Sequence, residues 1–180
     1  MSPARSYRRA PRGRPSIGFQ LEVPAELEIC ESSDLHCREV RPDGRVVGEV
    51  EVSVFAAALV IDRDGILAEM AVEGLNRLTT LRRGVVASPV ALPGGNGFRT
   101  AAVNSGPLPY LYAFAIAPSD LGVDGGVMIT IRAASPDWAP ADHVLRSLRV
   151  LTRNGRVATN IDADDAPILP VVGTAQKPES

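Results

Sequence analysis

Lysine is almost missing from this chain of 180 residues, because the only one is Lys177, close to the C-terminal end. A Schiff-base lysine or a nucleotide-binding P-loop lysine inside the folded part is therefore excluded. Histidine and cysteine are also scarce, with two residues of each. Nucleophilic, acid–base and metal chemistry depend heavily on these residue types. The sequence thus offers few places for an active site, and we expect no enzyme and no cofactor.

Long apolar runs are missing as well, although 45% of the residues are hydrophobic. No stretch approaches the roughly 20 apolar residues of a membrane-spanning helix. The arginine-rich start is not followed by the apolar segment of a secretory signal peptide. We therefore expect a cytoplasmic protein without a membrane span, in which a stable disulfide is disfavoured.

Acidic residues are missing from residues 1–16, which contain five arginines, so the net charge of −2 hides an acidic body with a basic arm. This is not the charge pattern of a nucleic-acid-binding domain, which gathers basic residues on one folded face. The segment is rich in Pro, Arg, Ser and Gly, a composition typical of disorder. We expect a solvated tail or else an arm for an acidic partner or nucleic acid, with Arg8 and Arg9 as candidate binding residues.

Apolar periodicity predicts a single α+β domain over residues 17–156. Alternation predicts strands, with a short extended piece before Cys30 and longer strands over residues 17–23, 46–61, 85–92, 98–103, 110–117 and 127–133. A helical period predicts one helix over residues 64–83, with Asp64 as N-cap, and a second helix after Asp137. Antiparallel strands with helices between them indicate an α+β fold with a sheet of about six strands.

The predicted strand over residues 110–117 is apolar on both faces, which is typical of a strand in the centre of a covered sheet. Tyr110, Tyr112 and Phe114 share one of its faces. Aromatic residues on a sheet can stack nucleic-acid bases, but here their neighbours are leucine and alanine and not lysine or arginine. The pattern therefore favours core packing under a helix.

The middle of the chain resembles the PsbP/DcrB-like superfamily, which includes the Ran-binding Mog proteins. The resemblance covers about residues 17–151. It lies in the opening F-x-L-x-V-P strand, the helix "ILAEMAVEGLNRLTTL", the strands "FRTAAV", "PYLYAFAIA" and "GGVMITIRA", and the closing "HVLRSLRV". It implies an antiparallel sheet with helices packed on both faces. Members are mostly non-enzymatic adaptors, assembly factors, lipoproteins or chaperones for secreted effectors. The missing signal peptide and lipobox favour a cytoplasmic adaptor or chaperone among these roles.

The C-terminal segment, residues 157–180, is acidic but contains the apolar stretch "APILPVVG". Ile168, Leu169, Val171 and Val172 make it a candidate docking peptide for a protein partner. The carboxylates of "DADD", residues 162–165, lack the glycine and the closing glutamate of an EF-hand calcium loop. We interpret them as a solvated acidic stretch.

Both cysteines and one histidine lie in "CESSDLHC", residues 30–37, and the other histidine is His143. Two cysteines and two histidines suit a tetrahedral zinc site. However, there is no C-x2-C pair, and His36 and Cys37 are adjacent, so their side chains diverge in an extended chain. A disulfide is feasible in length but disfavoured by the compartment. We expect a polar connection with two reduced cysteines and no metal.

These observations predict a non-catalytic protein-binding module, an adaptor or chaperone for a secretion or assembly system. One alternative is a structural subunit of a larger assembly that docks through the C-terminal segment. Another is a metal-binding protein built on Cys30, His36, Cys37 and His143.

Overall fold

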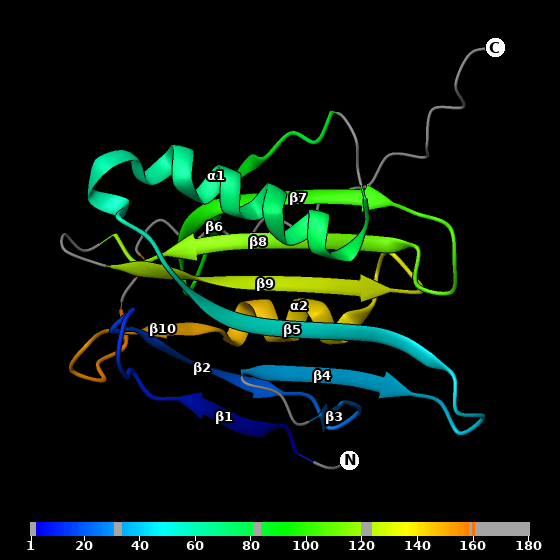
Figure 1. Cartoon of the computed structure of the whole chain (residues 1–180). Helices are drawn as coiled ribbons and strands as arrows, with labels where there is room; N and C mark the ends of the chain where they lie inside the picture. Colours follow the sequence, from blue (N-terminus) through cyan, green and yellow to red (C-terminus); the bar gives the residue numbers. More distant parts are fainter. Residues whose placement is uncertain (1–2, 31–33, 81–83, 120–123, 159, 161–180) are drawn as a thin grey trace.

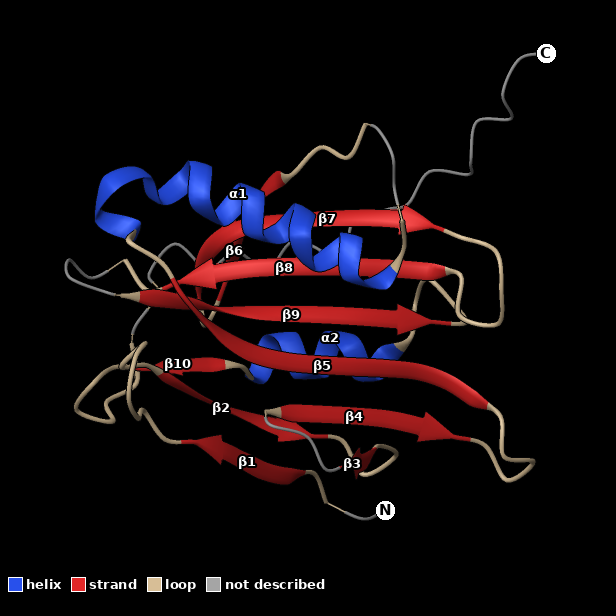
Figure 2. Cartoon of the chain, viewed as in Figure 1, coloured by secondary structure: helices blue, strands red, loops and turns tan. Residues whose placement is uncertain are grey.

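The computed structural model describes residues 3–30, 34–80, 84–119, 124–158 and 160, which form ten strands and two helices (Figure 1; Figure 2). In chain order the elements are β1 (Arg5–Arg9), β2 (Gly18–Val23), β3 (Glu28–Cys30), β4 (Leu35–Val40), β5 (Val46–Ala56), α1 (Leu59–Leu78), β6 (Ser88–Leu92), β7 (Gly95–Val103), β8 (Tyr110–Ala117), β9 (Gly125–Ala133), α2 (Ala139–Ser147) and β10 (Arg149–Leu151).

The strands form two antiparallel sheets. The large sheet has seven strands in the order β3-β4-β5-β9-β8-β7-β6, and the small sheet has three in the order β1-β2-β10. The α+β class is confirmed. The prediction of one sheet of about six strands is wrong, because β4 lies where a polar connection was expected and because β1 and β10 form a second sheet with β2.

Strand β8 has two different faces, and each suits a different covering layer. Ala113, Ala115 and Ala117 point to one face, where they pack with Leu67, Ala71 and Leu75 of α1. Small side chains let the helix approach closely. Gly74 of α1 also allows this close approach, since a Cβ built there would lie 3.1 Å from the Cβ of Ala113. Thr100 on β7 donates its hydroxyl to the carbonyl of Ala71 at 2.9 Å, which satisfies the buried polar group.

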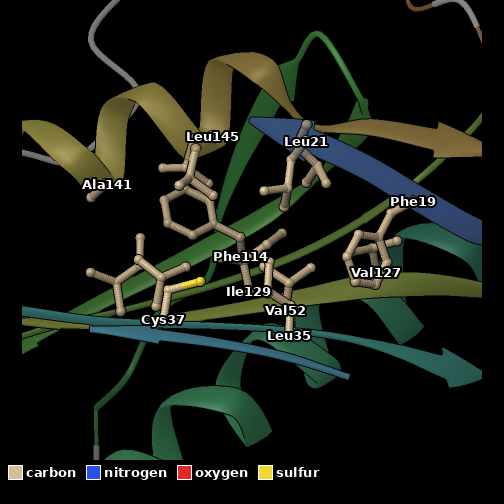
Figure 3. Packing of buried hydrophobic residues seen from close by; sticks show 14 of the residues in the cluster. Phe19, Leu21, Leu35, Cys37, Val52, Phe114, Val127, Ile129, Ala141 and Leu145 are labelled. Carbon is tan, nitrogen blue, oxygen red and sulfur yellow. The ribbon is translucent and has the colours of Figure 1, made fainter. Parts of the chain in front are cut away.

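The opposite face of β8 carries Tyr112, Phe114 and Ile116, all almost fully buried. This face packs against both α2 and the small sheet in one continuous core. In Figure 3, Leu145 of α2 lies over Phe114, and Leu21 of β2 lies beside them. The side-chain alternation that predicted a central strand is confirmed, because both faces of β8 are covered.

Trp138 and Gly48 fix the other end of this core. The indole N–H of Trp138 donates to Glu39 Oε2 at 2.6 Å, while its ring lies against the backbone of β5. A Cβ added at Gly48 would lie 2.2 Å from the indole ring. Glycine is therefore required at this position by close approach, not by backbone conformation.

Helix α1 begins at Leu59, five residues earlier than predicted, so the predicted strand ends at Ala56 and not at Ile61. The helix is kinked at Asp62, whose carboxylate accepts the backbone N–H of Gly65 at 3.1 Å. Asp62 thus caps the long part of the helix, a role predicted for Asp64. Next to it, the guanidinium of Arg63 donates to the carbonyls of Asn96 and Ala117, which ties the kink to the ends of β7 and β8.

The prediction of disorder over residues 1–16 is wrong for Arg5–Arg9, which form β1 and pair in register with β2. The positive charge of this segment suggested a solvated tail, but Arg9 is largely buried and paired. Its guanidinium lies 2.7 Å from the Asp34 carboxylate, with both side chains less than a fifth exposed. Arg5 donates to the carbonyl of Leu27. The arginines on this side of β1 therefore attach it to the β3–β4 region.

The C-terminal part of the domain also differs from its prediction. Helix α2 begins after Trp138 and not after Asp137, and the chain continues into β10, which pairs with Gly18–Gln20 of β2. Of the predicted segment 157–180, only Val157, Ala158 and Asn160 are among the described residues. Neither of the two helices described has the length and hydropathy that crossing a membrane requires.

The Arg9–Asp34 pair gives a test of whether β1 belongs to the folded domain. Removing either partner leaves a largely buried charge unpaired, so we expect Arg9→Ala and Asp34→Ala each to lower the free energy of unfolding by about 3 kcal/mol. A double-mutant cycle by urea denaturation measures the coupling. The exposed Asp142–Arg146 pair on α2 is the control, with an expected coupling of about 0.4 kcal/mol. Equal, small couplings for both pairs contradict the assignment of β1 to the fold.

Candidate functional site

A concave surface lies between α2 and the first two strands. Two adjoining cavities of about 680 and 500 Å³ both include Ala139 and His143, and together form one open groove. The remaining lining residues of the groove are Ala4, Ser6, Gln20, Leu21, Glu22, Pro24, Ala25, Glu26, Pro140, Asp142, Arg146, Ser147 and Arg149.

The groove exists because β10 is short. It pairs with β2 only at Gly18–Gln20, and α2 lies beside the rest of that strand. The backbone N–H of Glu22, which continues the edge of β2 beyond β10, donates instead to the Ser147 hydroxyl at 2.9 Å. A helix is thicker than a strand, so its flank rises beside the outer face of the sheet and forms one wall of the groove.

One end of the groove is polar and carries mixed charge. Arg8, Gln20 and Arg149 are cross-strand neighbours on the outer face of the small sheet. The Arg149 guanidinium is oriented by the carbonyls of Arg146 and Leu148, each at 2.8 Å. Arg146 lies 2.9 Å from Asp142 on the adjacent turn of α2. The arginine side chains on this wall are thus held in defined positions.

The other end of the groove is lined mainly by small apolar residues: Ala4, Pro24, Ala25, Ala139 and Pro140. Between the two ends, His143 Nε2 lies 3.0 Å from Glu22 Oε2 and joins α2 to β2. The groove therefore offers apolar contact at one end and charged hydrogen-bonding groups at the other.

The side chains in the groove do not form a catalytic arrangement of the serine–histidine–carboxylate type. A nucleophilic serine must be hydrogen-bonded to the histidine that takes its proton. Here the Ser147 hydroxyl accepts the N–H of Glu22 and lies 3.1 Å from the carbonyl of Val144, and among the described contacts it has none with His143. Ser147 acts as a structural bridge between α2 and β2.

The predicted partner-binding residues fall into three groups. Arg8 lies beside Gln20 on the outer face of the small sheet, next to the polar end of the groove, with one guanidinium nitrogen 3.3 Å from the carbonyl of Gly155. Arg9 points to the opposite side of β1 and is occupied by Asp34. The four C-terminal residues, Ile168, Leu169, Val171 and Val172, lie outside the described residues.

Most residues of the groove were missed by the sequence analysis as a site. Gln20 and Glu22 alternate with core residues on β2, while Asp142, His143 and Arg146 lie on the polar side of α2. Each set alone is an ordinary solvent-facing pattern. No signal in the sequence shows that the two sets face one another, because that depends on the pairing of β2 with β10.

Cys30 lies in β3 and residues 35–37 lie in β4, and the pairing of these two strands separates the two thiols. Cys30 is opposite His36, while Cys37 is opposite Ile29 and Val50. Cys30 and His36 therefore point to one face of the large sheet and Cys37 to the core. Both cysteines are free. Among the described residues, no group of three or more potential ligands is placed to hold a metal ion.

A small cavity of about 210 Å³ lies on the face of the large sheet that carries His36, beside the C-terminal end of α1. Charges alternate across this face in the row Glu28, Arg38, Glu49 and Arg132. His36 lies 3.8 Å from Glu49. Neighbouring opposite charges stabilise a solvated sheet face, and we assign this region no binding role.

Tyr112 is the one buried tyrosine whose hydroxyl has no hydrogen-bond partner within the described part of the chain. Burial raises its pKa above the usual value, with Tyr110 and Asp137 contributing. None of the cavities above includes it. The hydroxyl is therefore a cost to stability without an associated site.

No protein-family model, no curated protein and no solved structure matches this chain. The similarity to the PsbP/DcrB-like superfamily therefore stays a prediction from the sequence.

The two cysteines should differ strongly in reactivity. Burial, and to a lesser extent the nearby Cys30, raise the pKa of Cys37 to about 11 from 9.0. We expect iodoacetamide to modify Cys30 in the native protein and to spare Cys37 up to pH 9, with both modified in urea. The Cys37 thiol ionises at a lower pH in the unfolded chain than in the folded one. The free energy of unfolding should therefore fall as pH rises from about 9 to 11. Mass spectrometry of modified peptides checks the first expectation, and modification of both at equal rates contradicts it.

The Tyr112 hydroxyl gives a second prediction. Removing a buried, unpartnered hydroxyl relieves its desolvation cost, so Tyr112→Phe should keep or raise the free energy of unfolding, by up to about 1 kcal/mol. The control is Tyr7→Phe, whose hydroxyl lies 3.5 Å from the carbonyl of Asp34 and whose removal should be neutral or slightly destabilising. A loss of more than about 1 kcal/mol in Tyr112→Phe shows that the hydroxyl has a partner.

Proposed function

We propose that this protein is a non-catalytic protein-binding module, an adaptor or chaperone, that holds a partner segment in the groove between α2 and β1–β2. The observation that carries the proposal is the groove itself, with an apolar end at Pro24 and Pro140 and a polar end at Arg146 and Arg149. Binding surfaces commonly combine an apolar centre with a polar rim.

The walls of the groove are anchored in the core, which favours binding. Helix α2 is held by Ala141, Val144 and Leu145 in the main core, and β2 by alternate residues including Phe19 and Leu21. A site on such elements loses little conformational entropy when it is occupied. The small side chains at the apolar end leave room for apolar side chains of a partner, while the charges at the other end orient the bound segment.

The contacts of the side chains in the groove support binding rather than catalysis. The Ser147 hydroxyl is hydrogen-bonded to the backbone N–H of Glu22, whereas the His143 ring contacts the Glu22 carboxylate. The resemblance to the PsbP/DcrB-like superfamily agrees, since its members are mostly adaptors, assembly factors and chaperones. A PsbP/DcrB-like sandwich, a cytoplasmic location and a role beside a secretion or assembly system belong to the same proposal.

The proposal is tested by blocking the groove. Ala139 is exposed at the start of α2 and lines both cavities, so Ala139→Arg fills the groove without entering the core. We expect the tagged wild-type chain to recover a stoichiometric protein from native lysate, and Ala139→Arg to weaken the binding of that protein, once purified, by at least about tenfold in calorimetry.

The matched control is Ala58→Arg, the same change at the exposed start of α1, on the opposite side of the large sheet. It should leave the affinity unchanged. Equal affinities for both variants, or equal losses with both, contradict the groove as the binding site. A purified chain that recovers no stoichiometric protein under any condition contradicts the proposed function as a whole.

A further inference from the structure

Two arginines at the polar end of the groove have no carboxylate partner within the described residues. Strand pairing places Arg8, Gln20 and Arg149 in one row across the outer face of the small sheet. Because adjacent strands lie about 4.8 Å apart, the backbones of the two arginines are about 10 Å apart, with Gln20 between them. None of the ion pairs in the described part of the chain includes either arginine. The row therefore carries positive charge that the fold itself does not neutralise.

The backbone already orients both guanidinium groups. Nη1 of Arg149 donates to two carbonyls at the end of α2, each at 2.8 Å. Arg8 has one guanidinium nitrogen 3.3 Å from the carbonyl of Gly155. A guanidinium has five N–H donors, so each arginine keeps donors for a further group. Its planar fork matches a carboxylate, which accepts two parallel hydrogen bonds. This end of the groove is therefore suited to bind a carboxylate.

The other charges along the groove favour an acidic peptide over a nucleic acid. Glu22 and Asp142 line the same groove, and Glu26 lies at its apolar end. The phosphates of a nucleic acid repeat along its whole length, so they would meet these three carboxylates as well as the arginines. A peptide can carry its carboxylate at one end only and an apolar side chain at the other. The two ends of the groove match such a peptide.

We propose that the segment bound in the groove carries an aspartate or glutamate that binds between Arg8 and Arg149, and an apolar side chain that packs at Pro24. This inference rests on the proposed function of the groove, and it defines the chemistry of the partner segment. The segment is extended, because the floor of the groove is a strand. Gln20, Glu22 and Pro24 alternate along that strand with buried residues, and an extended chain has the same period.

The length of the groove floor sets the spacing of the two anchor residues in the partner. Pro24 follows Gln20 by four positions. At about 3.3 Å per residue, these positions are about 13 Å apart. An extended segment that lies along β2 has the same rise per residue. Its acidic and apolar residues should therefore be about four positions apart, whereas a helix would need about nine positions to span the same distance.

Selection from a displayed library of random dodecapeptides tests the inference. Peptides are selected on the full-length chain, and those that also bind Ala139→Arg are removed. We expect the enriched peptides to share an acidic and an apolar residue about four positions apart. Arg8→Glu and Arg149→Glu should each weaken the binding of such a peptide by at least about tenfold. The control is Arg45→Glu, at an exposed arginine between β4 and β5, which should leave the affinity unchanged.

A charge swap separates recognition of the carboxylate from damage to the fold. The selected peptide is made again with lysine in place of its acidic residue. This peptide should bind Arg8→Glu at least about tenfold more tightly than it binds the wild-type chain. Damage to the fold cannot produce such a gain. A lysine peptide that binds the wild-type chain and Arg8→Glu equally overturns the inference.

The remaining outcomes distinguish failure of this inference from failure of the groove. Enriched peptides without an acidic residue, or with the spacing of a helix, overturn the inference. An oligothymidylate that binds more tightly than the selected peptides also overturns it, because the occupant is then a nucleic acid. Peptides that are lost with Ala139→Arg but unaffected by Arg8→Glu overturn the inference and leave the groove as the binding site. If every enriched peptide binds Ala139→Arg equally well, or no peptide is enriched, both the inference and the groove are contradicted.

Discussion

The unequal faces of β8 are the constraint on which the rest of the structure depends. Alternation places alanines on one face and large aromatic or aliphatic residues on the other. The alanine face can be covered only at short distance, which α1 achieves through Ala71 and Gly74. The aromatic face leaves a thicker space, which a sheet and a helix fill together. One strand thus sets the depth of both layers.

The candidate site follows from how the thicker layer is shared. Strand β2 spans its width, but β10 pairs with only part of it before α2 takes over. The step between strand and helix produces the groove, and Ser147 closes the backbone hydrogen bonding at the step. Helix α2 must stay close to β2, because Val144 and Leu145 belong to the same core as Phe19. The groove is thus a consequence of core packing.

The sequence was a good guide to elements stabilised by their own periodicity. The boundaries of β8 match the prediction, and the stripe of Leu67, Ala71 and Leu75 is the buried face of α1. It was a poor guide where a partner far along the chain decides the structure. The segment around Arg9 has the composition of a disordered tail, but in the fold the charge of Arg9 is paired with that of Asp34. The start of α1 was placed too late because a first turn from Leu59 precedes the kink at Asp62, whose carboxylate caps the longer part of the helix.

By itself, the sequence determined the α+β class, the central strand and the shortage of catalytic residue types, because each depends on local pattern or on composition. Only the tertiary structure decided that the cysteines face opposite sides of a hairpin, that β1 joins a second sheet, and that the polar sides of β2 and α2 form one groove. These features depend on strand register and on the packing of two layers. The hairpin register is set by pairs such as Cys30 with His36, whereas the groove depends on contacts between residues more than a hundred positions apart, such as Glu22 with His143.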